Sequence, residues 1–189
     1  MSSSPPPRKP NVVGLFNTSI ADPVERIQAY LDGYAKNPDF HGWDLIVMQH
    51  TKVISARKTQ ATETGMETHV VFEIEIVPGM CSSMGNAHGG MIATMSDNTT
   101  SMAAGPMAEE GFWDFGGLSR TLNITYLRPI PQGIVVRSEN FVRSAGKRLC
   151  AIQCVMKDKA TGKVLALAEH NKAALDAEGR KQRRAPGSL

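Results

Sequence analysis

The segment CSSMGNAHGGMIATMSDNTTSMAAG, residues 81–105, carries the strongest structural signal in the chain. Gly89 and Gly90 open a run of Met, Ile and Ala residues interrupted by hydroxyl residues, a composition typical of a helix that is buried on most sides. The first turn of any helix leaves about four backbone N–H groups without partners, and such a start binds an oxyanion well. The sequence therefore predicts one long buried helix that begins at an anion-binding glycine pair.

Asp97 is the only acidic residue in this segment, and no basic residue lies within seven positions of it. A buried carboxylate without a partner costs several kcal/mol, so its presence needs a reason. Asp97 follows Gly90 by about two helical turns, and Ser101 follows Asp97 by about one, so the three residues share a face. Two interpretations stay open. Asp97 is a structural acceptor on a strand-facing or solvated stripe, or it is a base that Ser101 orients beside an anion site.

Strand-like segments flank the predicted helix on both sides. In residues 68–77, apolar residues such as Phe72 and Ile74 alternate with Glu73 and Glu75, which indicates a sheet with one solvated face. Residues 44–58 are also rich in β-forming residues. Further strand-like segments follow the helix at residues 118–127, 133–143, 149–157 and 163–173.

Several motifs resemble one family. His88-Gly89-Gly90 followed by Asp97 resembles the signature of hotdog-fold acyl-CoA thioesterases of the phenylacetyl-CoA thioesterase type, which include the thioesterase superfamily members. Residues 119–129, SRTLNITYLRP, are similar to the family's central strand, and residues 146–149 and 160–163 to its last two hairpin turns. The resemblance implies an α+β hotdog fold, with a curved antiparallel sheet of about six strands wrapped around one long central helix, plus an N-terminal helix.

The resemblance also implies an active site for thioester hydrolysis. The backbone N–H of Gly89 would hold the developing oxyanion, and Asp97 would act as general base or as nucleophile, a choice that the sequence leaves open. It further implies a site between subunits, with Gly89 of one chain facing Asp97 of the other. Ser119 aligns with a serine that positions the water or the carboxylate, although it is equally explained as an ordinary hydroxyl at a strand start. Ser82 stands where many relatives carry Asn, which leaves its catalytic role open.

His88 is a further catalytic candidate, but the sequence favours a structural histidine that fixes the turn before Gly89. The other histidines make no zinc-ligand spacing with His88 or with the cysteines, and no GxSxG nucleophile elbow is present. We therefore expect no metal and no cofactor. Cys150 and Cys154, four residues apart on a predicted strand, are expected in the core.

A coenzyme A substrate carries phosphates, for which exposed basic residues are the natural partners. Lys147 and Arg148, on the hairpin turn at residues 146–149, are the first candidates. Arg120 and Arg128 of the central strand come second. The aromatic residues Phe112, Trp113 and Phe115 after the helix either wall the acyl pocket or cap the helix end. The predicted substrate contacts are Gly90, Ser101, Arg120, Arg128, Lys147 and Arg148.

The chain of 189 residues is long enough for one domain, which we place at residues 20–175, with an N-terminal helix starting at Asp22-Pro23. Residues 1–19 are predicted to be a disordered tail, and residues 176–189 a basic flexible tail. The formal charge of +3 and the absence of aromatic residues in the basic tail argue against nucleic acid.

The odd number of cysteines, three without a CxxC pair, fits a reducing compartment, and no apolar run approaches the roughly 18 residues of a membrane span. We expect a cytoplasmic protein. A mitochondrial transit peptide is the alternative, because no acid precedes Asp22, but three consecutive prolines oppose an amphipathic helix.

The predicted substrate is an acyl-CoA or acyl-carrier-protein thioester, and the acyl group is not indicated. A single hotdog leaves an edge strand unpaired, so we expect a homodimer, or a tetramer formed as a dimer of dimers. Two alternatives remain. One is a hotdog protein recruited to another reaction on a thioester or polyketide-like substrate. The other is a non-catalytic acyl-binding hotdog, for which Ser82 in place of Asn is the only support and against which Asp97 argues.

Overall fold

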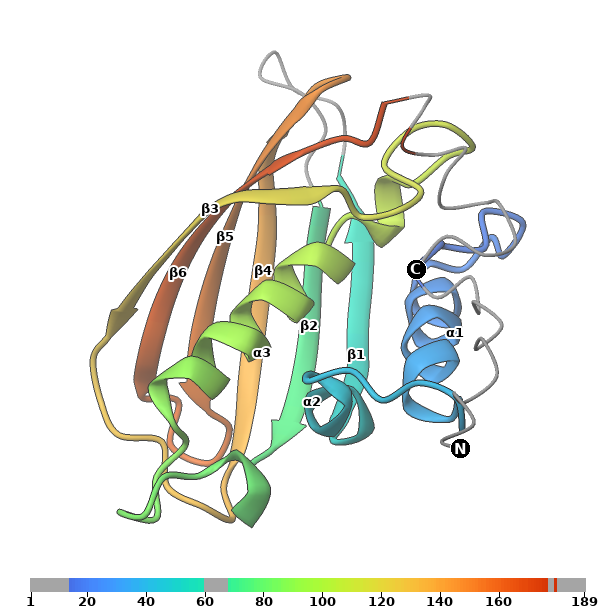
Figure 1. Cartoon of the computed structure of the whole chain (residues 1–189). Coiled ribbons are helices and arrows are strands. Elements are labelled where there is room, and N and C mark those ends of the chain that lie inside the picture. The colour runs from blue at the N-terminus through green and yellow to red at the C-terminus, as the bar shows by residue number, and fades with distance from the viewer. Residues whose placement is uncertain (1–13, 60–67, 177–178, 180–189) are drawn as a thin grey trace, which may run out of the picture.

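Six strands form one antiparallel sheet, and one long helix lies across its concave face (Figure 1). The structure is a computed structural model that describes residues 14–59, 68–176 and 179. The order of strands in the sheet is β1-β2-β4-β5-β6-β3. The elements are α1 (Pro23–Ala35), α2 (Leu45–Gln49), β1 (Thr51–Lys58), β2 (Thr68–Glu75), η1 (Pro78–Met80), α3 (Gly89–Met102), η2 (Gly105–Met107), β3 (Leu118–Tyr126), β4 (Val135–Ala145), β5 (Leu149–Asp158) and β6 (Val164–Ala173).

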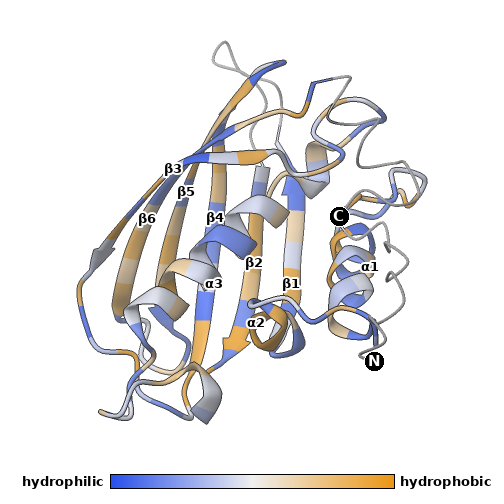
Figure 2. Ribbon diagram, in the orientation of Figure 1, coloured by the Kyte–Doolittle hydropathy of each residue, from blue (hydrophilic) through white to orange (hydrophobic). Residues whose placement is uncertain are grey.

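The sheet follows from alternation along its strands, where hydrophobic and hydrophilic residues take turns (Figure 2). Along β4 the buried residues alternate with less buried ones from Val136 to Val142, and Ile152 of β5 and Ala168 of β6 are likewise buried between less buried neighbours. Because side chains alternate between the faces of a strand, these residues gather on the side of α3. The predicted sheet of about six strands around one central helix, with the helix between the second and third strands, is confirmed.

Helix α3 buries many hydroxyl residues as well as its methionines. The hydroxyls of Ser96, Thr99 and Thr100 donate to the carbonyls four residues earlier, at 2.6–2.9 Å. This satisfies polar groups that would otherwise be costly to bury. A helix of this composition can therefore lie against the sheet, as its sequence predicts.

Residues 44–58 differ from the expected strand in their first part, which forms helix α2. The β-branched residues in Leu45–Gln49 favour a strand, but Val47 and Met48 are adjacent and both buried. A strand would point one of them away from the core, whereas a helix turns both toward it. The strand prediction is correct only from Thr51 onward, in β1.

The N-terminal segment packs more closely than predicted, because the tail assigned to residues 1–19 includes residues of the core. Phe16 is buried, and its N–H donates to the Asp114 carbonyl at 2.8 Å. The guanidinium of Arg26 in α1 donates to the carbonyls of Gly105 and Ala108, which fixes α1 to the segment after α3. Residues 1–13, and all of the predicted basic tail except residues 176 and 179, lie outside the described residues.

The two edges of the sheet are covered differently. Helix α1 packs on β1 at one edge, whereas β3 at the other edge pairs with β6 alone among the described strands. Leu118 and Tyr126 at the two ends of β3 are exposed, and so is Leu127 just beyond it. The edge of β3 is therefore open to another strand. In the part of the chain that is described, no helix combines the length and the apolar character needed to cross a bilayer.

Candidate active site

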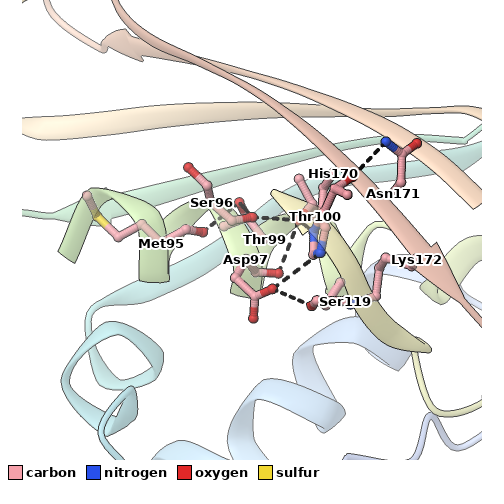
Figure 3. Close-up of polar contacts among 11 residues, drawn as sticks. Met95, Ser96, Asp97, Thr99, Thr100, Ser119, His170, Asn171 and Lys172 are labelled. Atoms are coloured by element: carbon pink, nitrogen blue, oxygen red, sulfur yellow. Dashed lines mark hydrogen bonds and ion pairs between the residues drawn. The ribbon is translucent and has the colours of Figure 1, made fainter. Parts of the chain in front are cut away.

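Asp97 lies on the side of α3 that faces β3, with its side chain 40% exposed. The hydroxyl of Ser119 donates to Asp97 Oδ1 at 2.8 Å (Figure 3). The register between β3 and β6 shifts between Ser119 and Thr121, an irregularity of the kind that re-aims side chains. The predicted partnership of Asp97 and Ser119 is thus present as a direct contact within one chain.

Lys172 of β6 reaches the same group from the sheet. Its Nζ lies 2.7 Å from Ser101 Oγ and 3.4 Å from Ser119 Oγ, and the residue is buried. An ammonium group only donates, so Ser119 accepts from Lys172 and gives its own proton to Asp97. Burial lowers the pKa of Lys172, and the charge of Asp97 opposes that change. Ser101, predicted to share the face of Asp97, therefore serves as the main anchor of this cation.

His170, two residues before Lys172, lies between Asp97 and Thr100 (Figure 3). Its Nδ1 is 2.6 Å from Thr100 Oγ1, and its Nε2 is 3.4 Å from Asp97 Oδ1, which is long for a hydrogen bond. Burial, and then the charge of Lys172, lower the pKa of His170 to about 4, although the Asp97 carboxylate raises it. At neutral pH the ring is thus uncharged. The single proton of the Thr100 hydroxyl is donated to the Ser96 carbonyl, so Thr100 Oγ1 accepts from the N–H at Nδ1. The Nε2 atom is then left buried without a hydrogen-bond partner among the described residues.

The low pKa of His170 predicts a pH dependence of stability. Its ordinary value is 6.5, so between pH 6.5 and about 4 the unfolded chain binds a proton that the folded protein does not. The contribution of His170 to the free energy of unfolding should therefore be fully present above pH 6.5. Between pH 7 and pH 5 the free energy of unfolding should fall by about 2 kcal/mol because of this residue. Urea unfolding of the native protein and of His170→Gln at both pH values checks this.

The control is His41→Gln, which removes an exposed histidine. The native protein and His41→Gln should lose stability equally on acidification, while His170→Gln should lose distinctly less. Equal losses in all three proteins would show that His170 is not the titrating group.

The start of α3 is ordered by His88 and by Tyr126 of β3. The Nδ1 of His88 accepts from the Gly90 N–H at 3.0 Å, so this histidine caps the helix. The hydroxyl of Tyr126 donates to the Gly89 carbonyl at 3.1 Å. Among the described residues nothing accepts a hydrogen bond from the Gly89 N–H, which leaves it as a donor for a ligand.

Gly89 and Asp97 are not brought together within one chain. They are eight residues apart on one helix, which corresponds to about 12 Å at about 1.5 Å per residue. An oxyanion donor and a base must each lie about 3 Å from the reacting atoms. One protomer alone therefore does not assemble both halves of the predicted site.

Ser82 lies in the loop before α3, where its hydroxyl makes only local hydrogen bonds among the described residues. Its hydroxyl donates to the Asn86 carbonyl at 3.2 Å and accepts from the Met84 N–H at 3.4 Å. This closes the turn that leads to the helix, and no contact joins Ser82 to Asp97 in the described part of the chain.

The basic residues predicted for coenzyme A separate into two groups. Arg120 lines a cavity of about 340 Å³ with Ser144 and Leu149, the residues that flank the turn of Lys147 and Arg148. Arg128 follows the other end of β3, where its guanidinium donates to the Val164 carbonyl at 2.6 Å. Three of the four candidates thus gather at one end of the sheet.

A cavity of about 220 Å³ opens beside Asp97. Ser101, Ser119 and Lys172 line it, and Phe115 contributes to its wall. Trp113 is instead a core residue that donates to the Gly146 carbonyl at 2.9 Å. Of the two interpretations of the aromatic loop, the pocket wall therefore applies to Phe115. The opposite wall comes from residues that the sequence did not single out, namely Tyr30, Tyr34, Asp44 and Met48.

His170 and Lys172 were also missed, although the sequence carried a signal for them. Along β6, Ala166, Ala168, His170 and Lys172 occupy alternate positions, and all four are buried. Two polar residues at the end of an otherwise apolar face are unusual, because such a face normally packs in the core. Cys150 and Cys154 are buried as predicted, and burial raises the pKa values of their thiols to about 12 and about 11.

Known proteins resemble the chain in sequence and in fold. Residues 84–165 match the family model described as Thioesterase superfamily. Acyl-coenzyme A thioesterase 13 of Homo sapiens and that of Pongo abelii are each 33% identical over 103 residues, which cover 54% of this chain and 71% of theirs. The solved structure of zebrafish thioesterase superfamily member 2 matches with a TM-score of 0.67 and 26% identity, over 80% of this chain and 98% of its own. The resemblance seen in the sequence is confirmed, and the chain is a hotdog-fold thioesterase that belongs to the thioesterase superfamily.

Proposed function

We propose that this thioesterase hydrolyses an acyl-coenzyme A to free acid and thiol, with Asp97 as the reacting carboxylate. The observation that carries the proposal is the contact between Asp97 and Ser119 at the wall of a polar cavity. The family supplies thioester hydrolysis, and the name of its acyl-coenzyme A thioesterase relatives supports coenzyme A as the carrier. A non-catalytic acyl-binding protein would have no need of a carboxylate held in this way.

In this mechanism Ser119 holds one oxygen of Asp97 and leaves the other for chemistry. Oδ1 accepts from Ser119, so Oδ2 takes a proton from the attacking water, or attacks the thioester carbon itself. In the first route the carbon–sulfur bond breaks as the acid forms, and the proton that Asp97 took from water passes to the leaving thiolate. In the second route the thiolate leaves and takes a proton from water, and a further water then hydrolyses the Asp97 anhydride to the free acid and the original carboxylate. Both routes use the same carboxylate in the same orientation, which Lys172 supports through Ser119.

The oxyanion donor comes, in this proposal, from a second chain. About 12 Å separates Gly89 from Asp97 along α3, whereas Gly89 of a partner could face Asp97 if the two sheets joined at β3. The open edge of β3 and its exposed Leu118 and Tyr126 support this pairing. We therefore propose a homodimer as the smallest active unit, with a tetramer as its further assembly.

Mixed dimers test both the function and the shared site. Asp97→Asn and Gly89→Val are each expected to be inactive in thiol release from acyl-CoA. Dimers that contain one chain of each kind hold one intact site. After subunit exchange of an equal mixture, about a quarter of the native activity should return, since about half of the dimers are mixed and half of their sites are intact. Gly89→Val adds side-chain atoms where a Cβ meets only Tyr126 at 3.8 Å within the chain, so the chain should still fold.

The control is a mixture of two separately prepared Asp97→Asn samples, which should stay inactive. If the mixed variants also stay inactive while exchange is shown by labelled chains, the site is not shared between subunits. If the native protein releases no thiol from any acyl-CoA, the hydrolase proposal itself is wrong.

The phosphates of coenzyme A would lie at the end of the sheet that carries Arg120, Lys147 and Arg148. The cavity lined by Arg120 opens beside the turn of the other two residues, and guanidinium and ammonium groups bind phosphate readily. Arg128 is left out of this assignment, because it lies beyond the other end of β3 and donates to a backbone carbonyl.

A further inference from the structure

The wall of the Asp97 cavity that faces α3 is built by the N-terminal extension. Tyr30 and Tyr34 of α1 line it, with their hydroxyl oxygens 3.4 Å apart, and Phe40 meets the Tyr34 ring edge-on with centroids 4.9 Å apart. Arg26 fixes the same helix to the segment after α3. This wall is a packed aromatic layer on an anchored helix, so it sets a fixed boundary to whatever occupies the cavity.

The same wall carries a second carboxylate, Asp44, which precedes α2. Its Oδ2 accepts from the Asn98 side-chain amide at 3.2 Å, and Asn98 directly follows Asp97 in α3. Within the described ranges no cation pairs with Asp44, and its side chain caps no backbone N–H of α2. Asp44 is thus a partly buried acceptor on the cavity wall, held in place by one amide.

The charges that line this cavity do not balance. Asp44 and Asp97 are its acids, and Lys172 is its only base among the described residues. The Lys172 ammonium is already directed at Ser101 and Ser119. An anionic group that entered the cavity would therefore meet carboxylates without a free cation. Like charges placed together in this way disfavour binding strongly.

We propose that Asp44 is a specificity-determining residue that excludes acyl groups ending in a carboxylate, so that the protein acts on neutral acyl thioesters. The inference rests on the proposed acyl-CoA hydrolysis and adds a substrate class to it.

The test compares two acyl groups of equal shape that differ in charge. Glutaryl-CoA ends in a carboxylate, and glutaramoyl-CoA ends in the neutral amide of the same size. The native protein should prefer the amide by at least about tenfold in kcat/KM. In Asp44→Asn the preference should fall to within about twofold of unity, because the repelling charge is gone.

Two controls make the comparison specific. Asp39→Asn removes the same charge from an exposed position in the same loop, outside the cavity, and should keep the native preference. The dissociation constants of the two non-hydrolysable S-alkyl thioether analogues of these substrates should show the same pattern as the rates. Asp44→Asn preserves the shape of the side chain, and its unfolding midpoint is compared with the native value.

The outcomes separate the two proposals. If thioesters are hydrolysed but the native preference is near unity, or persists in Asp44→Asn, the role of Asp44 is refuted and the hydrolase proposal stands. If no thioester is hydrolysed but the analogues show a preference that Asp44→Asn abolishes, the hydrolase proposal fails and the exclusion by Asp44 holds as a property of binding. If the analogues bind without preference, the exclusion is refuted whatever the rates.

Discussion

Asp97→Asn is expected to lower kcat for acyl-CoA hydrolysis by at least about a hundredfold, since a positioned base contributes about 10²–10⁴ in rate. The amide is nearly the same size and still accepts from Ser119, so the local structure should remain. It cannot take a proton from water, and it cannot form an anhydride with the acyl group. The rate is measured as thiol release with a chromogenic disulfide, and KM should change much less than kcat.

Glu169→Gln provides the matched control for this substitution. Glu169 is an exposed carboxylate of β6, on the face of the sheet away from α3, and its removal should leave kcat within about threefold of native. A similar small effect in Asp97→Asn would exclude this carboxylate as base and as nucleophile. That result would favour the alternative of a non-catalytic acyl-binding hotdog protein.

The sequence predicted those parts of the protein that depend on local pattern. Helix α3 was predictable because its glycine start and its apolar run are contiguous, and the shared face of Asp97 and Ser101 follows from helical spacing alone. The strands after α3 were predictable because their alternation and turn glycines are local signals. Helix α2 was missed because its β-branched residues favour a strand, and only tertiary packing of Val47 and Met48 decides otherwise.

The parts of the site that were missed depend on strand register and on packing between distant segments. Lys172 reaches Ser119 because β3 pairs with β6 at the edge of the sheet, about fifty residues away in sequence. Asp44 reaches the cavity because α1 and α2 pack on the core, which no spacing within residues 36–50 indicates. The contact of Asp97 with Ser119 was anticipated only through the family resemblance, since residues 97 and 119 lie on different elements.

Lys172→Met should have opposite effects on activity and on stability, because we expect the buried ammonium to support activity and to lower stability. Burial lowers the pKa of Lys172, which means that the folded protein holds this charge less readily than the unfolded chain does. Met removes the cost of burying this charge, and the Asp97 side chain, which is 40% exposed, is not left as a buried unpaired charge. The free energy of unfolding, measured in urea, should therefore be unchanged or higher in the variant.

Activity should move in the opposite direction. The hydrogen bond from Lys172 to Ser119 is long, at 3.4 Å, so we take the lower end of the range for a charged donor, about 1.5 kcal/mol, and expect its loss to lower kcat by about tenfold. The exposed Lys163 provides the control, and Lys163→Met should change neither quantity appreciably. A variant that loses stability and activity together would show that Lys172 is a structural residue.

Ser119→Ala tests whether Lys172 affects kcat through the Ser119 hydroxyl. In the structure Lys172 reaches Asp97 through the Ser119 hydroxyl, which accepts from the ammonium and donates to the carboxylate. The double variant should therefore lose little more kcat than the more damaging single variant, because both substitutions break one chain of hydrogen bonds. Multiplicative losses would mean that Lys172 acts on the reaction directly, by its charge. A gain in stability together with a loss of activity in Lys172→Met would mean that this buried cation serves the proposed reaction at Asp97 and not the stability of the fold.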